Sequence, residues 1–342
     1  MAAKDNSWRN FMMSKNDGFR LFHVLKKIKG TFVYQKGKLK AQIRNPKLLA
    51  SIPTLSPLVS QNSPQYIISF TSYKGRLTGT APYAIISILN QSIKPDKIVL
   101  WVGHQDKENI PEIIHDLTQK GLEIRFCDDV KAYTKLVYSL ATFPNDYIIT
   151  ADDDIYYPPN WFEQIVDEHK KNPTKIICHR VHAIRVDENH NLLPYNKWDS
   201  FLNSREAAHR PHSIFPEGVG GILYPPNALH KDVTNKELFM RLSPHNDDIW
   251  YWAMALINTE YFGNESPYIV IANGYAGVQG IDPDYETGEY GLWQYNILQN
   301  QNDEQFKVVV AHYPKIREIL QKIEPNFENY WRKLRIALRY NW

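Results

Sequence analysis

The segment YIITADDDIYYPP, at residues 147–159, holds the most informative pattern in this 342-residue chain. An apolar run leads directly into three aspartates, and Pro158-Pro159 then prevents a strand from continuing. Because three adjacent carboxylates repel one another, they must be hydrated, paired or bound to a cation. Their hard oxygen atoms suit Mg²⁺ or Mn²⁺, which keep open positions for the phosphates of a substrate. A solvated acidic loop is the simpler alternative.

Apolar runs alternate with amphipathic segments from Gln65 onwards. The expected strands are 66–70, 97–102, 122–127 and 146–151, and the expected helices are 81–91, 111–119 and 131–142. This alternation predicts an α/β fold of the Rossmann-like kind, with a mostly parallel central sheet and helices on both faces. Ligands bind such sheets beyond the carboxyl ends of the strands. We therefore expect segment 71–76 and the triple aspartate to share one crevice.

Residues 149–158 and the segment 66–101 resemble glycosyltransferases of the GT-A fold, whose D-x-D motif holds a metal ion against the diphosphate of a nucleotide sugar. The likeness is strongest to bacterial enzymes that build capsule or lipopolysaccharide, including the α-N-acetylglucosaminyltransferases of heparosan-type capsules. It extends over residues 65–312 and weakens after 101. The resemblance implies a hexosyl- or N-acetylhexosaminyltransferase that uses a nucleotide-sugar donor, with UDP favoured, and an oligosaccharide or lipid-linked glycan acceptor.

The same resemblance assigns roles around the metal ion, which would be Mn²⁺ or Mg²⁺. It implies that Asp154 binds the metal, and that Asp152 contacts the ribose or a metal-bound water. Asp153 would support them or point toward the donor sugar. Many related enzymes complete the metal shell with a late histidine, and His312, after an expected strand at 306–311, is placed for that role. A purely structural histidine is the alternative.

Two further loops are expected to contact the nucleotide. After the first strand, the Thr71 hydroxyl can bind uracil or ribose, Tyr73 can stack on the base, and Arg76 can pair with phosphate. After the third strand, Lys135 could reach the diphosphate or an aspartate of the metal loop. Asp129 nearby is either a donor contact or a helix cap. An ordinary polar loop and a solvated helix lysine remain the alternatives.

Two later motifs complete the expected site. Gly220 and Gly221 would let the backbone approach the donor sugar and acceptor, or would only form a tight turn. Asp247 and Asp248 open a helix and resemble the x-E-D segment of GT-A enzymes, whose last carboxylate is the general base in inverting members. Because Asp247 stands where Glu is commoner, the choice of base between the two stays open. They could instead stabilise the helix N-terminus.

A polar cluster lies in residues 176–186, which we expect to form one strand lining the donor or acceptor pocket or facing solvent. The cluster contains His179, Arg180, His182 and Arg185. No cysteine or carboxylate spacing supports a zinc site here.

Composition limits the class of protein. Hydrophobic residues make up 43% and aromatic residues 13% of the chain, which is ample for a core. No apolar stretch approaches the ~20 residues that span a bilayer, and residues 1–10 lack the apolar region of a signal peptide. Cys127 and Cys178 lie in strand-like contexts, so we expect reduced core thiols in a cytoplasmic protein.

Charge is distributed unevenly. Residues 1–48 contain twelve Lys and Arg but only two Asp, a net charge of +10, so a total of +3 leaves −7 on the remainder. Residues 330–342 add four cations, no acid and several aromatic side chains. Because no nucleic-acid motif accompanies this charge, we expect peripheral binding to the anionic inner face of the cytoplasmic membrane. Packing of both ends on the catalytic body or on a partner subunit is the alternative.

The expected organisation has three parts. Residues 1–64 form a basic arm and linker, and residues 65–315 form the catalytic domain. That domain divides into a nucleotide-binding half, 65–155, and an acceptor-binding half, 156–315. An aromatic and basic amphipathic tail occupies residues 316–342.

Other classes fit less well. A sugar nucleotidyltransferase needs a Gly-rich, Arg-containing loop after the first strand, but segment 71–76 has a single glycine. A non-catalytic glycan-binding module would not need three carboxylates at a strand end. The chain also lacks the G-x-G-x-x-G and G-x-x-x-x-G-K-[ST] signatures of dehydrogenases and P-loop NTPases. A haloacid-dehalogenase-type phosphatase would have Thr or Val where Tyr156 stands.

Overall fold

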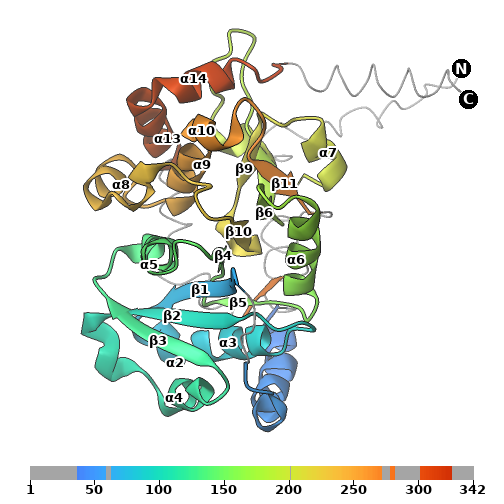
Figure 1. The fold of residues 1–342 in the computed structure, drawn as a ribbon, viewed down its shortest axis with the longest axis vertical. Helices are drawn as coiled ribbons and strands as arrows, with labels where there is room; N and C mark the ends of the chain where they lie inside the picture. Colours follow the sequence, from blue (N-terminus) through green and yellow to red (C-terminus); the bar gives the residue numbers. More distant parts are fainter. Residues whose placement is uncertain (1–36, 59–62, 201, 272–277, 282–300, 326–342) are drawn as a thin grey trace, which may run out of the picture.

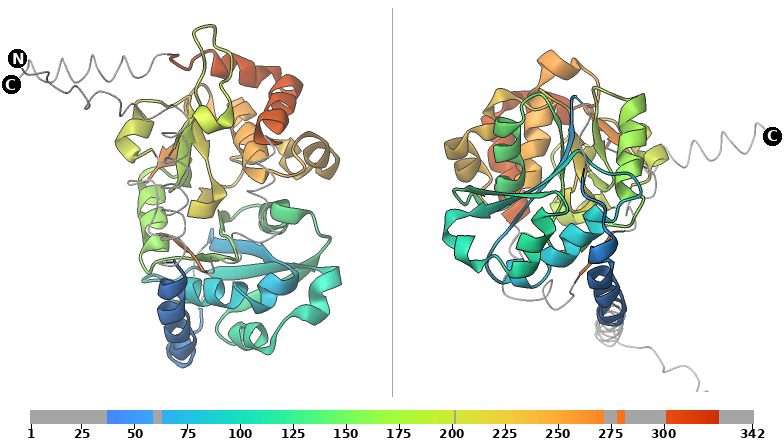
Figure 2. Two further views of the ribbon diagram at one scale, coloured as in Figure 1. Left: turned by 180° about the vertical axis from the view of Figure 1, so that it is seen from behind. Right: turned by 60° about the horizontal axis from the view of Figure 1, so that its bottom comes forward.

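The computed structural model describes residues 37–58, 63–200, 202–271, 278–281 and 301–325. A seven-stranded central sheet runs through this part of the chain and is flanked by helices on both faces (Figures 1 and 2). In spatial order its strands are β11 (Tyr268–Val270), β6 (Ile176–Cys178), β10 (Ile222–Tyr224), β4 (Tyr147–Thr150), β1 (Tyr66–Ser72), β2 (Lys97–Gly103) and β3 (Leu122–Cys127). The four strands predicted up to residue 151 therefore all form.

The sheet is mostly parallel, as predicted. β3, β2, β1 and β4 are parallel neighbours, β6 is parallel to β11, and β10 alone runs antiparallel between β4 and β6. Ser69 of β1 is paired with Thr150 of β4. Because both strands run the same way, the segment after β1 and the triple aspartate after β4 leave the sheet at the same edge.

Successive residues of the central strands enter two different cores. Ile67 and Ile148 pack in the core that includes α5, α9, α13 and α14. Ile68 and Ile149 pack in the core that includes α3, α4 and α6. Since both faces of these strands are buried, their sequences are continuous apolar runs rather than alternating ones.

The remaining elements surround this sheet. The helices are α2 (Lys74–Thr78), α3 (Ala81–Leu89), α4 (Glu112–Thr118), α5 (Thr134–Thr142), α6 (Trp161–Lys171), α7 (Ser204–Ala208), α8 (Lys236–Leu242), α9 (Asp247–Ile257), α10 (Thr259–Phe262), α13 (Gln301–His312) and α14 (Pro314–Leu320). Short 3₁₀ turns include η3 (Lys131–Tyr133) and η5 (Gly218–Gly220). Two small antiparallel sheets join β8 (Asp199–Ser200), β7 (Val181–Ala183) and β9 (Ile214–Pro216), and β12 (Gln279–Gly280) with β5 (Ile155–Tyr156).

Two sequence predictions of strands are wrong. The expected strand at 306–311 is part of helix α13, which buries Phe306 and Val309 one turn apart. The expected strand at 176–186 is two short strands in different sheets, because β6 belongs to the central sheet and β7 to a small one. The segment therefore does not form the single continuous strand that was predicted.

A helix at residues 37–51 packs against the catalytic body. It buries Ala41 and Leu48, and Leu48 belongs to the core that includes α3. These residues were predicted to be part of the basic arm. The rest of the arm, residues 1–36, and most of the predicted tail, residues 326–342, lie outside the described residues. In the part of the chain that the structure describes, no helix is both long and apolar enough to cross a membrane.

Candidate active site

The three carboxylates that follow β4 are held by cations from two other segments. The ammonium of Lys135, from α5, is 2.7 Å from Asp152. The guanidinium of Arg76, from α2, is 2.7 Å from Asp153 and 2.9 Å from Asp154. The predicted convergence of the 71–76 segment with the triple aspartate is therefore confirmed, and three negative charges share two positive ones.

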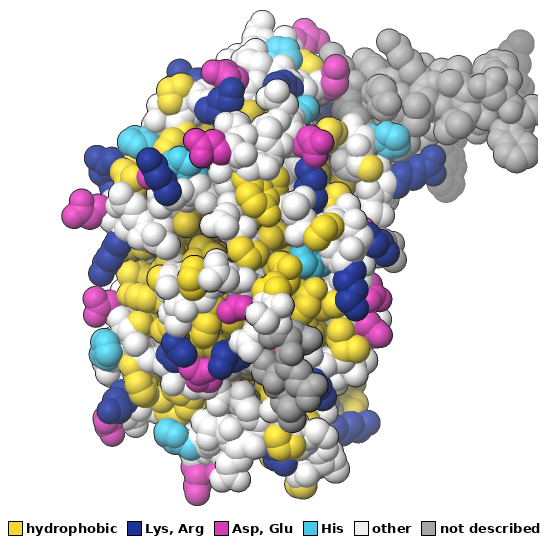
Figure 3. Space-filling model, viewed as in Figure 1, with side chains coloured by type: hydrophobic (Ala, Val, Ile, Leu, Met, Phe, Trp, Pro, Cys, Tyr) yellow, Lys and Arg dark blue, Asp and Glu magenta, His cyan; other side chains and the backbone are white. Residues whose placement is uncertain are grey.

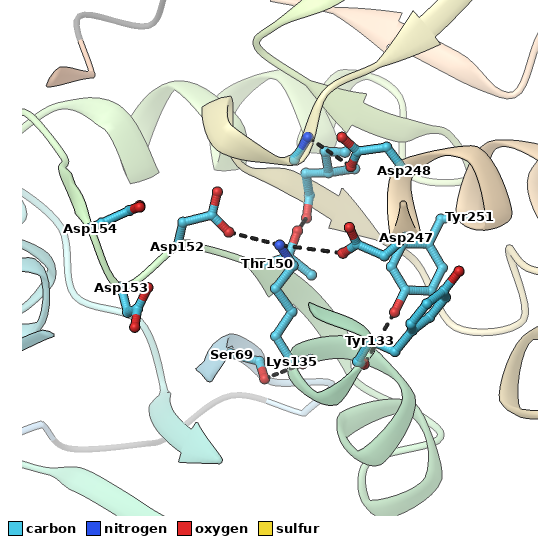
Figure 4. Close-up of polar contacts among 12 residues, drawn as sticks. Ser69, Tyr133, Lys135, Thr150, Asp152, Asp153, Asp154, Asp247, Asp248 and Tyr251 are labelled. Atoms are coloured by element: carbon cyan, nitrogen blue, oxygen red, sulfur yellow. Dashed lines mark hydrogen bonds and ion pairs between the residues drawn. The ribbon is translucent and has the colours of Figure 1, made fainter. Parts of the chain in front are cut away.

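Lys135 also connects the two acidic motifs of the chain. Its ammonium is 3.4 Å from Asp247 as well as 2.7 Å from Asp152, so it bridges the start of α9 to the end of β4 (Figure 4). The Lys135 side chain is only 9% exposed. Burial alone would lower the pKa of Lys135, but Asp152, Asp247 and Asp248 outweigh it and raise that pKa well above its usual value.

A buried polar network fixes the helix that presents Lys135. The Ser69 hydroxyl of β1 donates to the Lys135 carbonyl and lies 2.7 Å from the Ser139 hydroxyl. The indole of Trp101 on β2 donates to Ser139 at 2.8 Å. These contacts attach α5 to two strands of the central sheet, so the position of the ammonium is set by the core rather than by a loop.

The predicted helix at Asp247 and Asp248 forms as α9, but its cap is Asn246. The Asn246 side chain accepts a hydrogen bond from the Ile249 amide at 3.1 Å. The Asn246 side chain satisfies one backbone amide, and Asp247 and Asp248 lie in the first turn of α9, where their charges also favour the helix N-terminus. Their catalytic role stays a prediction. Tyr133 anchors the same turn from η3, since its hydroxyl donates to the carbonyls of Ser243 and Asn246.

Asp248 is partly exposed and faces the glycine-rich turn. Its Oδ1 accepts a hydrogen bond from the Gly218 amide at 3.0 Å. Loss of hydration raises the pKa of Asp248 well above the usual range, and the adjacent Asp247 raises it further, while Lys135 opposes both. The result is a carboxyl group with an unusually high proton affinity at the end of the acidic cluster.

Packing explains two of the glycines that were candidates for ligand contact. A Cβ on Gly220 would lie 2.8 Å from Arg180 Cβ. Gly221 has a φ of +87°, and a Cβ there would lie 2.4 Å from the Trp161 ring. The Trp161 indole also donates to the Gly220 carbonyl at 2.8 Å. Contact between this turn and a donor sugar stays a prediction.

Three other predicted nucleotide contacts have local partners. The Thr71 hydroxyl donates to the Trp101 carbonyl at 2.9 Å. The Tyr73 ring lies 5.8 Å from the Arg76 guanidinium. Asp129 accepts a hydrogen bond from the Lys131 amide at 2.7 Å at the start of η3, but the N-cap residue of α5 is Tyr133. Thr71 lies in strand β1, just before its carboxyl end, whereas Tyr73 and Asp129 follow the ends of β1 and β3. The nucleotide contacts of all three stay predictions.

The reason for placing His312 at the metal does not hold. His312 is the exposed last residue of α13, not the residue after a strand, and its ring packs on Tyr313. Among the described residues, no group of three or more His, Cys, Asp or Glu side chains could hold a metal ion. The Asp152 carboxylate pairs with Lys135, which agrees with the prediction that Lys135 could reach an aspartate of the metal loop. Contact of Asp152 with the ribose or a metal-bound water stays a prediction.

Sequence reasoning missed two groups of residues beside the site. The Asp152 amide donates to the hydroxyl of the fully buried Tyr157 at 2.8 Å, which orders the start of the acidic loop. Glu217 accepts hydrogen bonds from Arg180 at 2.7 Å and pairs with His182 at 3.0 Å. Tyr157 could have been found from its place after the aspartates. Nothing in the local pattern marks Glu217.

Comparison with known proteins gives one family match. Residues 79–231 match the family model described as Glycosyl transferase family 2, which is less than half of the chain. The matched range includes Lys135, the triple aspartate and the glycine-rich turn, and it ends before Asp247. This match, with the mostly parallel sheet and its two helical layers, confirms the predicted GT-A architecture. Comparison with curated protein sequences found no match.

Two solved structures resemble the chain at low identity. TarS 1-349 from S. aureus, in complex with UDP, is 9% identical with a TM-score of 0.38, and covers 61% of this chain. The chain spans 58% of that TarS chain. The mannosyltransferase PcManGT from Pyrobaculum calidifontis, in complex with GDP-Man and Mn²⁺, is 13% identical with a TM-score of 0.46. The match covers 86% of this chain and 78% of the PcManGT chain.

Proposed function

We propose that this protein is a metal-dependent glycosyltransferase that moves a hexosyl or N-acetylhexosaminyl group from a nucleotide sugar to a bacterial surface glycan. The observation that carries the proposal is the Lys135 bridge between Asp152 and Asp247, which brings two separate acidic motifs to one point at the carboxyl edge of the sheet. The family match supports the reaction class. UDP as the nucleotide, and capsule or lipopolysaccharide as the product, rest on the sequence resemblance.

The acidic loop fits a divalent cation that shares its ligands with the substrate. Asp153 Oδ2 is buried and has no hydrogen-bond partner in the described part of the chain, and the Asp154 side chain beside it is 21% exposed. One or two carboxylates completed by substrate phosphates are a normal Mg²⁺ set, so three protein ligands are not required. Asp154, with Asp153, would hold the ion, which when bound neutralises charge on the leaving diphosphate.

The other charged residues have roles that follow from their positions. Lys135 holds Asp152 and Asp247 in place and offers positive charge to a diphosphate at the strand ends. In an inverting transfer, Asp248 accepts the proton of the acceptor hydroxyl as the new C–O bond forms. The Gly218 amide orients that carboxylate. A retaining transfer would need no such base, and the two aspartates would then position the sugar.

The experiment for this proposal is Asp154→Ala, assayed for sugar transfer and for UDP binding by calorimetry with and without Mn²⁺. Transfer and metal-dependent UDP binding should both be lost while the fold is retained, because the residue lies in a loop outside both cores. Asp128→Ala is the matched control, since Asp128 is an exposed aspartate at the end of the parallel strand β3. Full activity in Asp154→Ala, or in excess EDTA, would contradict the assignment.

A further inference from the structure

Arg76 lies against the two carboxylates on which the proposed metal site depends. Its Nη1 atom is 2.7 Å from Asp153 Oδ1 and 2.9 Å from Asp154 Oδ2. The residue belongs to α2, which follows β1, whereas the aspartates follow β4. One guanidinium therefore joins the ends of two neighbouring parallel strands and compensates charge on both carboxylates.

This contact is shielded from water. The side chains of Arg76 and Asp153 are 16% and 5% exposed, so solvent screens the attraction less than at a surface pair. Even so, Arg76 does not use all the acceptors, because Asp153 Oδ2 is buried without a hydrogen-bond partner among the described residues. The loop thus contains a second, unsatisfied oxygen turned away from bulk water, which is a position that favours a further cation.

A guanidinium and a divalent cation repel each other, so they cannot hold the same two carboxylates equally well at contact distance. We propose that Arg76 is an internal counter-ion that competes with the divalent cation for Asp153 and Asp154. The metal then binds tightly only when the donor diphosphate adds negative charge of its own. This inference rests on the proposed function, and it predicts that donor and metal bind together.

The chemistry of arginine allows the exchange. A guanidinium presents its donors in a planar fork that suits phosphate as well as carboxylate. When a diphosphate arrives beside the strand ends, Arg76 can exchange carboxylate oxygens for phosphate oxygens and release Asp153 and Asp154 to the ion. The phosphate contact predicted from the sequence and the carboxylate contact in the structure are then two positions of one side chain.

The test is Mn²⁺ binding to the full chain, followed by the electron paramagnetic resonance signal of free Mn²⁺, with and without UDP. Arg76→Gln should bind Mn²⁺ alone at least ~10-fold more tightly than the wild type, since a competing charge is removed. It should also show a smaller effect of UDP on Mn²⁺ affinity. Lys74→Gln is the matched control, because Lys74 is an exposed cation of the same turn and should behave as the wild type.

Removal of Arg76 alone leaves two carboxylates without their cation and could impair folding. If so, Arg76→Gln combined with Asp153→Asn is compared with Asp153→Asn alone, and the double variant should bind Mn²⁺ more tightly through Asp154. The proposal would be wrong if Mn²⁺ affinity were the same in Arg76→Gln as in the wild type, and the same in the double variant as in Asp153→Asn. A wild type that binds no Mn²⁺ even with UDP would instead count against the proposed function, so the two failures are distinguishable.

Discussion

The pKa values of Lys135 and Asp248 are both raised. A raised pKa keeps the lysine positively charged, whereas it favours the neutral, protonated form of the aspartate. The carboxylates around Lys135 outweigh the effect of burial, so the lysine stays cationic. Asp248, raised by burial and by Asp247, takes up a proton more readily than an ordinary aspartate. A carboxyl group with raised proton affinity suits the general base that we propose for an inverting transfer.

Replacement of Lys135 by Met should separate the two acidic motifs. Transfer should fall by about 10²–10³, because a fixed charge at the strand ends is lost. Stability should fall by about 1–3 kcal/mol, since Asp152 and Asp247 lose a shared cation. Steady-state kinetics and thermal melting measure the two effects. Lys135→Arg should recover part of the rate, and Lys307→Met, in an exposed pair with Glu304, should change neither quantity.

Asp248→Asn should lower kcat by ~10² or more with little change in UDP affinity, because the amide keeps the shape but cannot accept a proton. The wild-type kcat/KM should decrease as pH falls through the raised pKa of Asp248, which lies above the ordinary aspartate value of 3.8. The Asn variant should lack this acidic limb. A wild-type rate in Asp248→Asn would mean that the carboxylate takes no part in proton transfer, as in a retaining reaction.

At the scale of elements, the sequence predicted best what is local and periodic. The strands up to β4, and helices α3, α4, α5 and α9, follow from apolar runs and helical spacing. The run Val308-Val309-Val310 led to the wrong prediction of a strand, because β-branched residues favour strands. The run is part of helix α13, in which Phe306 and Val309 are buried one turn apart. The turn after β6 and the Glu217 contacts depend on residues distant in sequence, which no local pattern records.

In the site, too, local patterns could be predicted from the sequence, whereas contacts between distant residues could not. The triple aspartate and its placement beside segment 71–76 could be predicted, because strand ends on one side of a parallel sheet must meet. The sequence also indicated that Lys135 could reach an aspartate of the metal loop. Its second contact, with Asp247, could not be predicted, because it forms only once α5, β4 and α9 are packed together. The placement of His312 failed together with the strand on which it depended.

Helix 37–51 is tied to the acidic loop through Arg44. Its guanidinium lies 4.7 Å from the centre of the Tyr156 ring and donates to the carbonyls of Gly280 and Ile281 at 3.3 Å. The Ile281 amide in turn donates to the Asp154 carbonyl at 2.8 Å. An N-terminal helix therefore contacts both strands of the β5–β12 pair, directly after the proposed metal loop.

We expect Arg44→Ala to raise the KM for the donor more than it lowers kcat, because the loop that holds Asp154 loses part of its support. It should also cost about 1–2 kcal/mol of stability through the lost stacking and hydrogen bonds. Kinetics at varied donor concentration and chemical denaturation check the two effects. Lys47→Ala, an exposed position on the same helix, is the control. Equal kinetics in the two variants would separate this helix from catalysis.

At the scale of the whole molecule, the distribution of charge differs between the body and the ends of the chain. On the described part of the face in Figure 3, Lys and Arg side chains are interspersed with Asp and Glu. Residues 1–36 alone carry eight Lys and Arg against two Asp, and residues 326–342 carry four against one Glu. The net positive charge of the sequence therefore comes from segments outside the described residues.

We expect the intact protein to pellet with anionic vesicles at low salt and to be released at high salt. Each basic residue near an anionic leaflet contributes about 1 kcal/mol, and salt screens it. Deletion of residues 1–36 and 326–342 should abolish pelleting and spare UDP binding. The cut falls before residue 37 because helix 37–51 packs on the body and must be kept. Neutral vesicles are the control, and should not bind the intact protein.

Two results would contradict this expectation in different ways. An intact protein that ignores anionic vesicles at low salt would mean that both ends pack on the body or on a partner subunit. Pelleting that survives the deletion would assign membrane contact to the body, where Leu39 and Ile43 on helix 37–51 are 59% and 54% exposed. Apolar contacts of that kind strengthen rather than weaken at high salt, so the salt dependence separates them from attraction by the basic ends.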